Sequence, residues 1–188
     1  MTSEERRRIA DCRIAVVGAT EFIDSIKAEL QQLGFESIQI IFSSDKQSAI
    51  NNFDVIGQGD TAQSVDGASS YFGQYNSPWA IPDRKGCKFS RFVNGAGAII
   101  VMPDDERDML CKPDLRQWAA TYMAGYCAFW NVAGCEWLRD SLSDIRNGVT
   151  SSAALKTAAH ICARIAANIA VGREVKHFPR FYLCKNLE

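Results

Sequence analysis

The chain has 188 residues, of which 47% are hydrophobic and 23% are charged, a balance that predicts one folded domain rather than a disordered chain. Because 21 basic side chains stand against 22 acidic ones, no electrostatic attraction to nucleic acid is expected. The seven cysteines follow no disulfide-like spacing, and the first residues contain no apolar signal segment. Both features are typical of a cytoplasmic protein, which is the expected location.

The first third of the chain alternates between strand and helix patterns. Residues 14–17 are a short apolar run rich in β-branched side chains, as in a central parallel strand. Apolar residues then recur at helical spacing as far as Gly34, and strands are expected at 38–42 and 54–56. Such a unit needs a right-handed crossover, so the expected fold is α/β, with a Rossmann-like, mostly parallel sheet flanked by helices.

The rest of the chain carries more mixed signals. Residues 58–92 are rich in turn-forming side chains, and a loop-rich insertion is expected there within a single Rossmann-like domain of residues 1–188. A strand is expected at 97–102, two long helices within 114–172, and an edge strand or a docked tail at 181–183. The uncharged stretch 117–135 reaches the length of a membrane span. Polar residues and glycines interrupt it, so a buried helix or a dimer interface is preferred and no membrane association is expected.

The candidate cofactor-binding residues all follow the first three expected strands: Gly18, Ala19, Thr20, Asp45, Lys46 and Asp60. Free backbone N–H groups beside Gly18, where a helix begins, could hold an anion. Asp45 follows the second strand, where a ribose-binding acid is expected, and Lys46 could neutralise a phosphate. Asp60 follows the third strand at the same sheet edge. Tight or solvated turns without a ligand are the alternatives that these residues leave open.

Cys87 is the candidate catalytic residue. Basic side chains flank it at positions 84, 85 and 88, and their charges favour the nucleophilic thiolate. An unreactive thiol is the alternative. No metal site is expected, because the chain has two histidines and no C-x-x-C pair.

Other thiols and cations have simpler interpretations. Cys127, Cys135 and Cys162 fall in apolar helical segments and are interpreted as core residues. His160 is interpreted as a helix residue with a satisfied side chain. The basic segment 172–180 follows a helix end, where cations complement the helix dipole, and anion capture is the alternative.

Four segments resemble, in this order, parts of the ThiF/MoeB family, the adenylyltransferases related to ubiquitin-activating enzymes. The segments are IADCRIAVVGA (9–19), LGFESIQIIF (33–42), DVIGQGD (54–60) and residues 149–172. The resemblance implies that Gly18, Asp45 and Asp60 hold Mg-ATP, that a substrate carboxylate is adenylated, and that Cys87 is the loop cysteine that receives the acyl group or sulfur. A small carrier protein or a peptide is an implied partner. The second glycine of the family's turn and its zinc cysteines are absent here.

Three functions follow from these patterns. The leading hypothesis is nucleotide binding that serves ATP-dependent adenylation of a carboxylate in cofactor, sulfur-transfer or peptide-modification chemistry. The first alternative is an NAD(P)-binding oxidoreductase-like domain, because GATEFI (18–23) resembles the GATGFIG turn of extended short-chain dehydrogenases. The second is a non-catalytic pseudoenzyme, a dimeric protein-binding module that uses an aromatic helix between Tyr122 and Trp137. A homodimer is expected, and whether the chain is an enzyme stays open.

Overall fold

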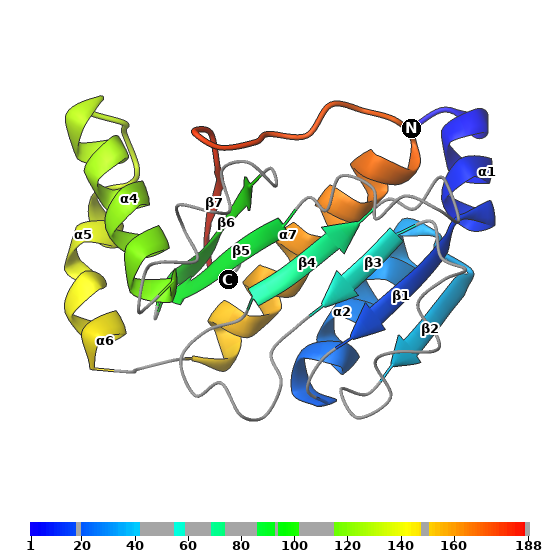
Figure 1. Cartoon of the computed structure of the whole chain (residues 1–188), viewed down its shortest axis with the longest axis horizontal. Coiled ribbons are helices and arrows are strands. Elements are labelled where there is room, and N and C mark those ends of the chain that lie inside the picture. Colours follow the sequence, from blue (N-terminus) through cyan, green and yellow to red (C-terminus); the bar gives the residue numbers. More distant parts are fainter. Residues whose placement is uncertain are drawn as a thin grey trace.

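The computed structural model describes residues 1–17, 20–41, 55–58, 69–73, 86–92, 94–101, 115–147 and 151–186. The strands in these ranges are β1 (Arg13–Val17), β2 (Ser37–Ile41), β3 (Val55–Gln58), β4 (Ser69–Gly73), β5 (Gly86–Phe92), β6 (Gly95–Val101) and β7 (Tyr182–Lys185). They form one sheet in the order β2-β1-β3-β4-β5-β6-β7 (Figure 1). The fold is therefore mixed α/β.

The expectation of a mostly parallel sheet is wrong. β1 pairs in parallel with β2 and β3, but every further pairing, from β3 to β7, is antiparallel. The difference comes from residues 58–92, which contain the two strands β4 and β5 where a loop-rich insertion was expected. Turn-forming residues between short strands dominate the composition of that segment, so composition alone predicted a loop. Antiparallel neighbours of this kind need no crossover helix.

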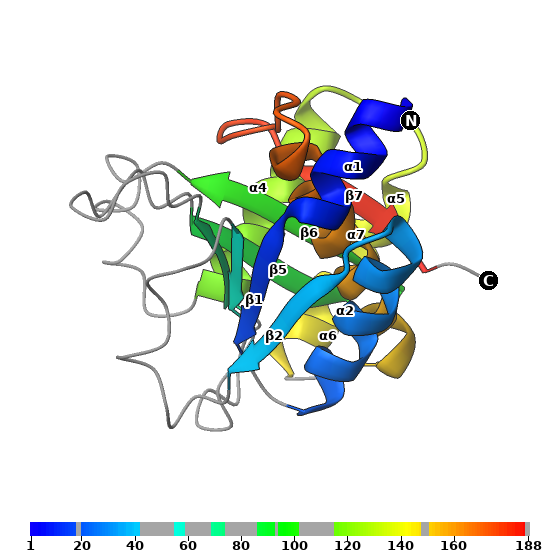
Figure 2. The same cartoon turned by 90° about the vertical axis from the view of Figure 1, so that its right-hand side faces the viewer.

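The helices in the described ranges are α1 (Ser3–Asp11), α2 (Thr20–Leu33), α4 (Leu115–Phe129), α5 (Glu136–Asp140), α6 (Leu142–Arg146) and α7 (Ser152–Ala170). The two long helices expected within 114–172 are α4 and α7, with the short α5 and α6 between them. Figure 2 shows α2 and α7 on one side of β1 and β2. In the described part of the chain, no helix combines the length and the apolarity needed to cross a membrane.

The parallel unit is built as its apolar pattern predicts. Ile14 and Val16 of β1 are fully buried, and Ile26 and Leu30 of α2 are buried one helical turn apart. Gly34 follows α2 with a φ of 101°, in the left-handed region where a helix-ending glycine is favoured. These side chains pack with α7 in one hydrophobic core.

Helix α7 is a long helix that packs against one face of the sheet. The Ser151 hydroxyl accepts a hydrogen bond from the Ala154 backbone N–H (3.1 Å) and caps the helix start. Gly172 ends the helix with a φ of 75°, as its place in the sequence predicts. The buried face is rich in small side chains, among them Ala158 and Ala163, so the helix can approach the sheet closely.

Strand β6 separates two hydrophobic cores. Ala96 and Ala98 belong to the core around α7, whereas Ile99 belongs to the core around α4. Because side chains alternate along a strand, Gly97 lies on the α4 side, where an added Cβ would clash with Met123 Sδ and lie 2.8 Å from Met123 Cε. A side chain at this position would therefore force the end of the buried Met123 side chain to move. β7 pairs with β6 at the end of the sheet, so the edge strand expected at 181–183 is confirmed.

Candidate functional site

The carboxyl ends of the three parallel strands lie side by side. Val17, the last residue of β1, is in register with Ile41 of β2 and with Gln58 of β3. The chain passes from β1 to β2 on one side of β1 and then to β3 on the other side. In open α/β sheets, ligands bind outside the carboxyl ends where the strand order reverses in this way. The pair β1/β3 is therefore the place in this fold where a nucleotide site is expected.

The predicted cofactor-binding residues continue directly from these strand ends. Gly18, Ala19, Asp45, Lys46 and Asp60 lie outside the described residues. Thr20 is the first residue of α2, but its side chain lies outside the described part of the structure. Only the strand ends that precede these residues are thus brought together by the described structure.

Cys87 lies away from these strand ends. It is in β5, where its backbone is level with Ser70 of β4 and Ile100 of β6. The expectation that Cys87 lies in a loop is therefore wrong, because Cys87 is part of a strand that pairs with another strand on each side. β5 is three strands from β1 in the sheet, which corresponds to roughly 14 Å at the usual strand spacing. Its role as a nucleophile stays a prediction.

A second candidate surface covers α4. The side chains that line its groove, called here the aromatic surface, are Trp118, Thr121, Tyr122, Gly125, Tyr126, Phe129 and Trp130. The groove has a volume of about 420 Å³. Phe129 is 80% exposed and Trp130 is 63% exposed, which is unusual for aromatic side chains of this size. None of the residues that line the groove is charged.

Ring contacts fix the base of the aromatic surface. Trp118 and Tyr122 stack with ring centroids 5.6 Å apart, and Phe178 lies 5.3 Å from Tyr122. The Tyr122 hydroxyl donates a hydrogen bond to the Pro179 carbonyl (2.7 Å). Burial, and then the neighbouring Tyr126, raise the pKa of Tyr122. Tyr122 therefore stays a neutral hydrogen-bond donor and holds α4 against residues 178–181.

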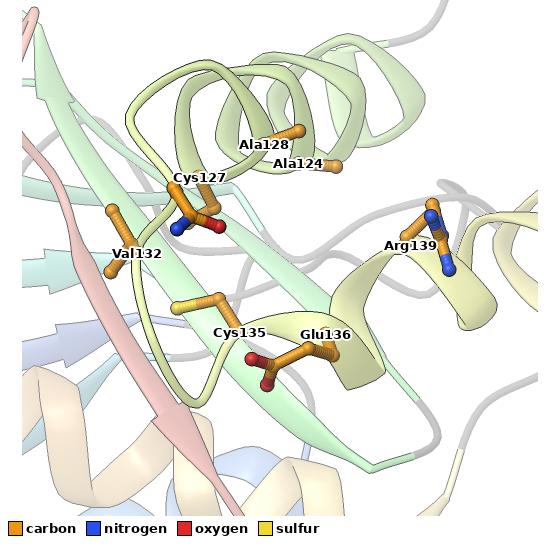
Figure 3. A pocket seen from close by; sticks show the side chains of 8 residues that line it. Ala124, Cys127, Ala128, Val132, Cys135, Glu136 and Arg139 are labelled. Atoms are coloured by element: carbon orange, nitrogen blue, oxygen red, sulfur yellow. The ribbon is translucent and has the colours of Figure 1, made fainter.

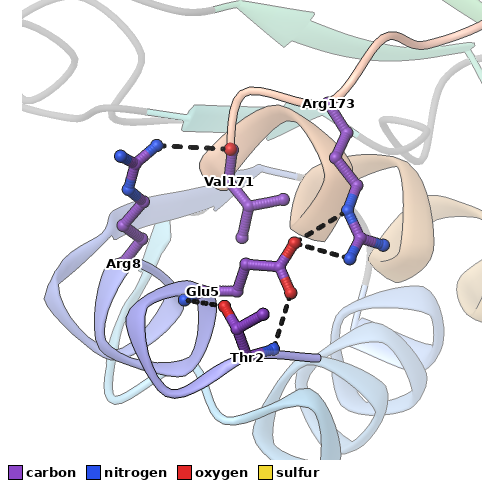
Figure 4. Close-up of polar contacts among 5 residues, drawn as sticks. All are labelled: Thr2, Glu5, Arg8, Val171 and Arg173. Carbon is purple, nitrogen blue, oxygen red and sulfur yellow. Dashed lines mark hydrogen bonds and ion pairs between the residues drawn. The ribbon is translucent and has the colours of Figure 1, made fainter.

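The basic segment 172–180 has partners within the chain. Arg173 donates to the Glu5 carboxylate from Nε (3.0 Å) and Nη2 (2.6 Å), and Arg8 donates to the Val171 carbonyl (3.4 Å), as Figure 4 shows. The Thr2 backbone N–H and then Arg173 lower the pKa of Glu5. These contacts fasten α1 to the end of α7, so the structure favours a structural role for Arg173 over anion capture.

The structure also gives the surroundings of His160. His160 Nδ1 lies 2.8 Å from a carboxylate oxygen of Glu29, so this side chain has a partner on α2, as expected. Among the described residues, no group of three or more His, Cys, Asp or Glu side chains could hold a metal ion.

Comparisons with known proteins give no family for this chain. No family model matches it, and neither the curated proteins nor the solved structures contain a significant match. The strand ends of the parallel unit and the aromatic surface of α4 are therefore the observations from which function can be argued.

Proposed function

We propose that the chain binds a nucleotide at the carboxyl ends of β1 and β3. The observation that supports this proposal is the strand order β2-β1-β3 with Val17 level with Ile41 and Gln58. α2 begins at Thr20, with only two residues between it and the end of β1, so its N-terminus belongs to the same sheet edge. The free N–H groups of a helix start attract anions, and phosphate is the group that a nucleotide would present there.

ATP is the nucleotide that the ThiF/MoeB resemblance implies. Gly18 follows β1 and Asp60 follows β3 by two residues, so the two strands that flank the reversal lead into the predicted phosphate and acid positions. Asp45 and Asp60 would hold the ribose and Mg²⁺. Adenylation of a carboxylate would then rest on positioning and on charge stabilisation, in cofactor, sulfur-transfer or peptide-modification chemistry.

Calorimetry with Mg-ATP and, separately, with NADH and NADPH tests the proposal. Asp60→Ala should remove Mg-ATP binding, whereas Asp140→Ala should leave it unchanged because Asp140 lies exposed on α5. Binding of a dinucleotide alone would favour the oxidoreductase-like alternative. No binding of any of the three by a folded wild-type protein would contradict the proposal.

A dimeric, non-catalytic module is the second candidate, because the aromatic surface carries both ridge and groove. Phe129 and Trp130 project from the end of α4, while the smaller Thr121 and Gly125 also line the groove. A two-fold contact places the same patch on both subunits, so a ridge on one copy could fill the groove of the other. Since the groove has no charged side chain, it carries no charge that would repel a second copy.

Sedimentation of the wild type against a Phe129→Ser/Trp130→Ser double variant tests this candidate. The double variant should be monomeric at concentrations where the wild type is dimeric. Val132→Ser is the matched control, because Val132 is 41% exposed but does not line this groove. A wild type that stays monomeric over a wide concentration range would rule out the second copy and direct attention to a carrier protein or peptide.

A further inference from the structure

Two cysteines lie together at the end of α4. Cys127 is in the last turn of α4 and Cys135 immediately precedes α5. Both line one pocket of about 240 Å³, shown in Figure 3. Cys127 is 6% exposed and Cys135 is partly exposed, so a reagent in solution reaches Cys135 first.

The backbone between the two cysteines reverses direction and returns over Cys127. Asn131 has a φ of 48°, and the Val132 N–H donates to the Cys127 carbonyl at 2.9 Å. Gly134 has a φ of 80°, a conformation that favours glycine, and it leads directly into Cys135. Local backbone geometry therefore places the second cysteine beside the first, and no distant packing is needed.

The two thiols are neighbours in this pocket. Burial, and then the neighbouring Cys135, raise the pKa of Cys127 to about 12. Cys127 is thus a protonated thiol at neutral pH, and it is the poorer nucleophile for a first attack on a reagent in solution.

An adjoining pocket is lined by both cysteines and by two cationic side chains. Its volume is about 370 Å³, and Cys127, Cys135, Lys176 and Arg180 are among the residues that line it. Lys176 Nζ lies 5.3 Å from the ring centre of Tyr182, and Arg180 Nη2 lies 3.4 Å from the Glu174 carboxylate. Neither cation is buried in an ion pair, so both can attract an anion that approaches the thiols.

We propose that Cys127 and Cys135 form a reversible disulfide through exchange with an anionic low-molecular-weight disulfide. The Cys135 thiolate attacks one sulfur of the reagent, and the reagent's other half leaves as a thiolate. Cys127 then loses its proton and attacks the Cys135 sulfur of the mixed disulfide, which releases the second half as a thiol. One reagent disulfide becomes two thiols while the two cysteine thiols become one disulfide, so atoms and electrons balance.

The disulfide would close the loop that carries the exposed end of the aromatic surface. Phe129 and Trp130 lie between the two cysteines in the chain. A cross-link around them restricts the loop without touching either ring, so the redox state sets how firmly the two side chains are presented. This device is independent of the nucleotide site proposed above.

Tryptic mapping of the full-length protein tests the proposal. Residues 117–139 contain no internal Lys or Arg, so trypsin releases one peptide that holds Cys127 and Cys135 and no other cysteine. After incubation of the folded protein with oxidised glutathione and alkylation under denaturing conditions, this peptide should be unalkylated and lighter by two hydrogen atoms. Cystamine, a cationic disulfide, should react several-fold more slowly, and Lys176→Gln/Arg180→Gln should reduce that preference.

The controls separate the pair from the other thiols. Cys135→Ser should abolish closure, whereas Cys184→Ser, which alters another partly exposed cysteine, should not. The oxidised wild type should melt about 5 °C higher than the reduced protein. Chymotrypsin should cleave it more slowly at Phe129 and Trp130. A glutathione adduct that persists on Cys135, or alkylation of both cysteines, would overturn the proposal.

Discussion

The two faces of β6 show two ways of covering one sheet. On the α7 side, the core consists mostly of buried aliphatic side chains, many of them from α2, β1 and α7. On the α4 side, the buried cluster is smaller, and partly buried aromatic side chains such as Trp118 and Phe181 surround it. Closed aliphatic packing leaves nothing for a partner to contact, whereas the aromatic side ends in exposed Phe129 and Trp130. The first region therefore supports the fold, and the second is suited to recognition.

The largest expected effect comes from truncating one leucine in each core. Leu30 and Leu138 are both fully buried, Leu30 on the α7 side and Leu138 on the α4 side. Each change to alanine should lower the free energy of unfolding by about 3 kcal/mol. Because β6 joins the two cores, denaturant unfolding should keep a single transition, and the two losses should add within about 0.5 kcal/mol. Two separate transitions would show that the regions unfold independently.

Substitutions of two glycines, Gly97 in β6 and Gly125 in α4, test how closely the α4 side of the sheet is packed. Gly97→Ala places a Cβ against Met123 and should cost about 2 kcal/mol. Gly125→Ala meets nothing within 4 Å and should stabilise α4 by about 0.5 kcal/mol, as alanine does in helices. Thermal unfolding of both variants measures the difference. If a second copy fills the aromatic surface, Gly125→Ala should also weaken the dimer while it stabilises the monomer.

The smallest effect concerns the contact of α1 with the end of α7. The pKa of Glu5 is lowered from 4.5 in the folded protein by the Thr2 backbone N–H and by Arg173. Its stabilising contribution is therefore present above pH 4.5 and is lost as the pH falls through the folded-state value. Glu5→Gln should lower the melting temperature slightly at pH 7, and this difference should shrink in acid. A difference that stays constant with pH would exclude the charge as its cause.

The sequence predicts the parallel unit and α7 well because each signal there is local. β1 is a continuous apolar run, and α7 ends at Gly172 as expected. β4 and β5 could not be predicted in the same way, since SSYFG and GCKFSRF gain their strand character from antiparallel neighbours. Long-range strand pairing determines whether such segments form strands, and the composition of a segment carries no information about that pairing.

The candidate sites also differ in whether local sequence signals could predict them. The alignment of the β1 and β3 ends follows from a parallel pairing that the sequence predicts, whereas the strand setting of Cys87 does not follow from its basic neighbours. The shared pocket of Cys127 and Cys135 was missed because a spacing of eight residues is no recognised motif. Cys127 is buried as expected, but Cys135 is only partly so. The one local signal was Gly134, which permits the chain to turn back.

The alternation along β6 also limits how this gene segment can change in length. A single inserted codon between Gly95 and Ile99 would exchange the two faces beyond it. Ile99 would then point toward the close-packed alanines of α7, and an alanine would replace it beneath α4. Substitutions in this strand have graded costs, but a one-residue insertion or deletion would disturb both cores at once.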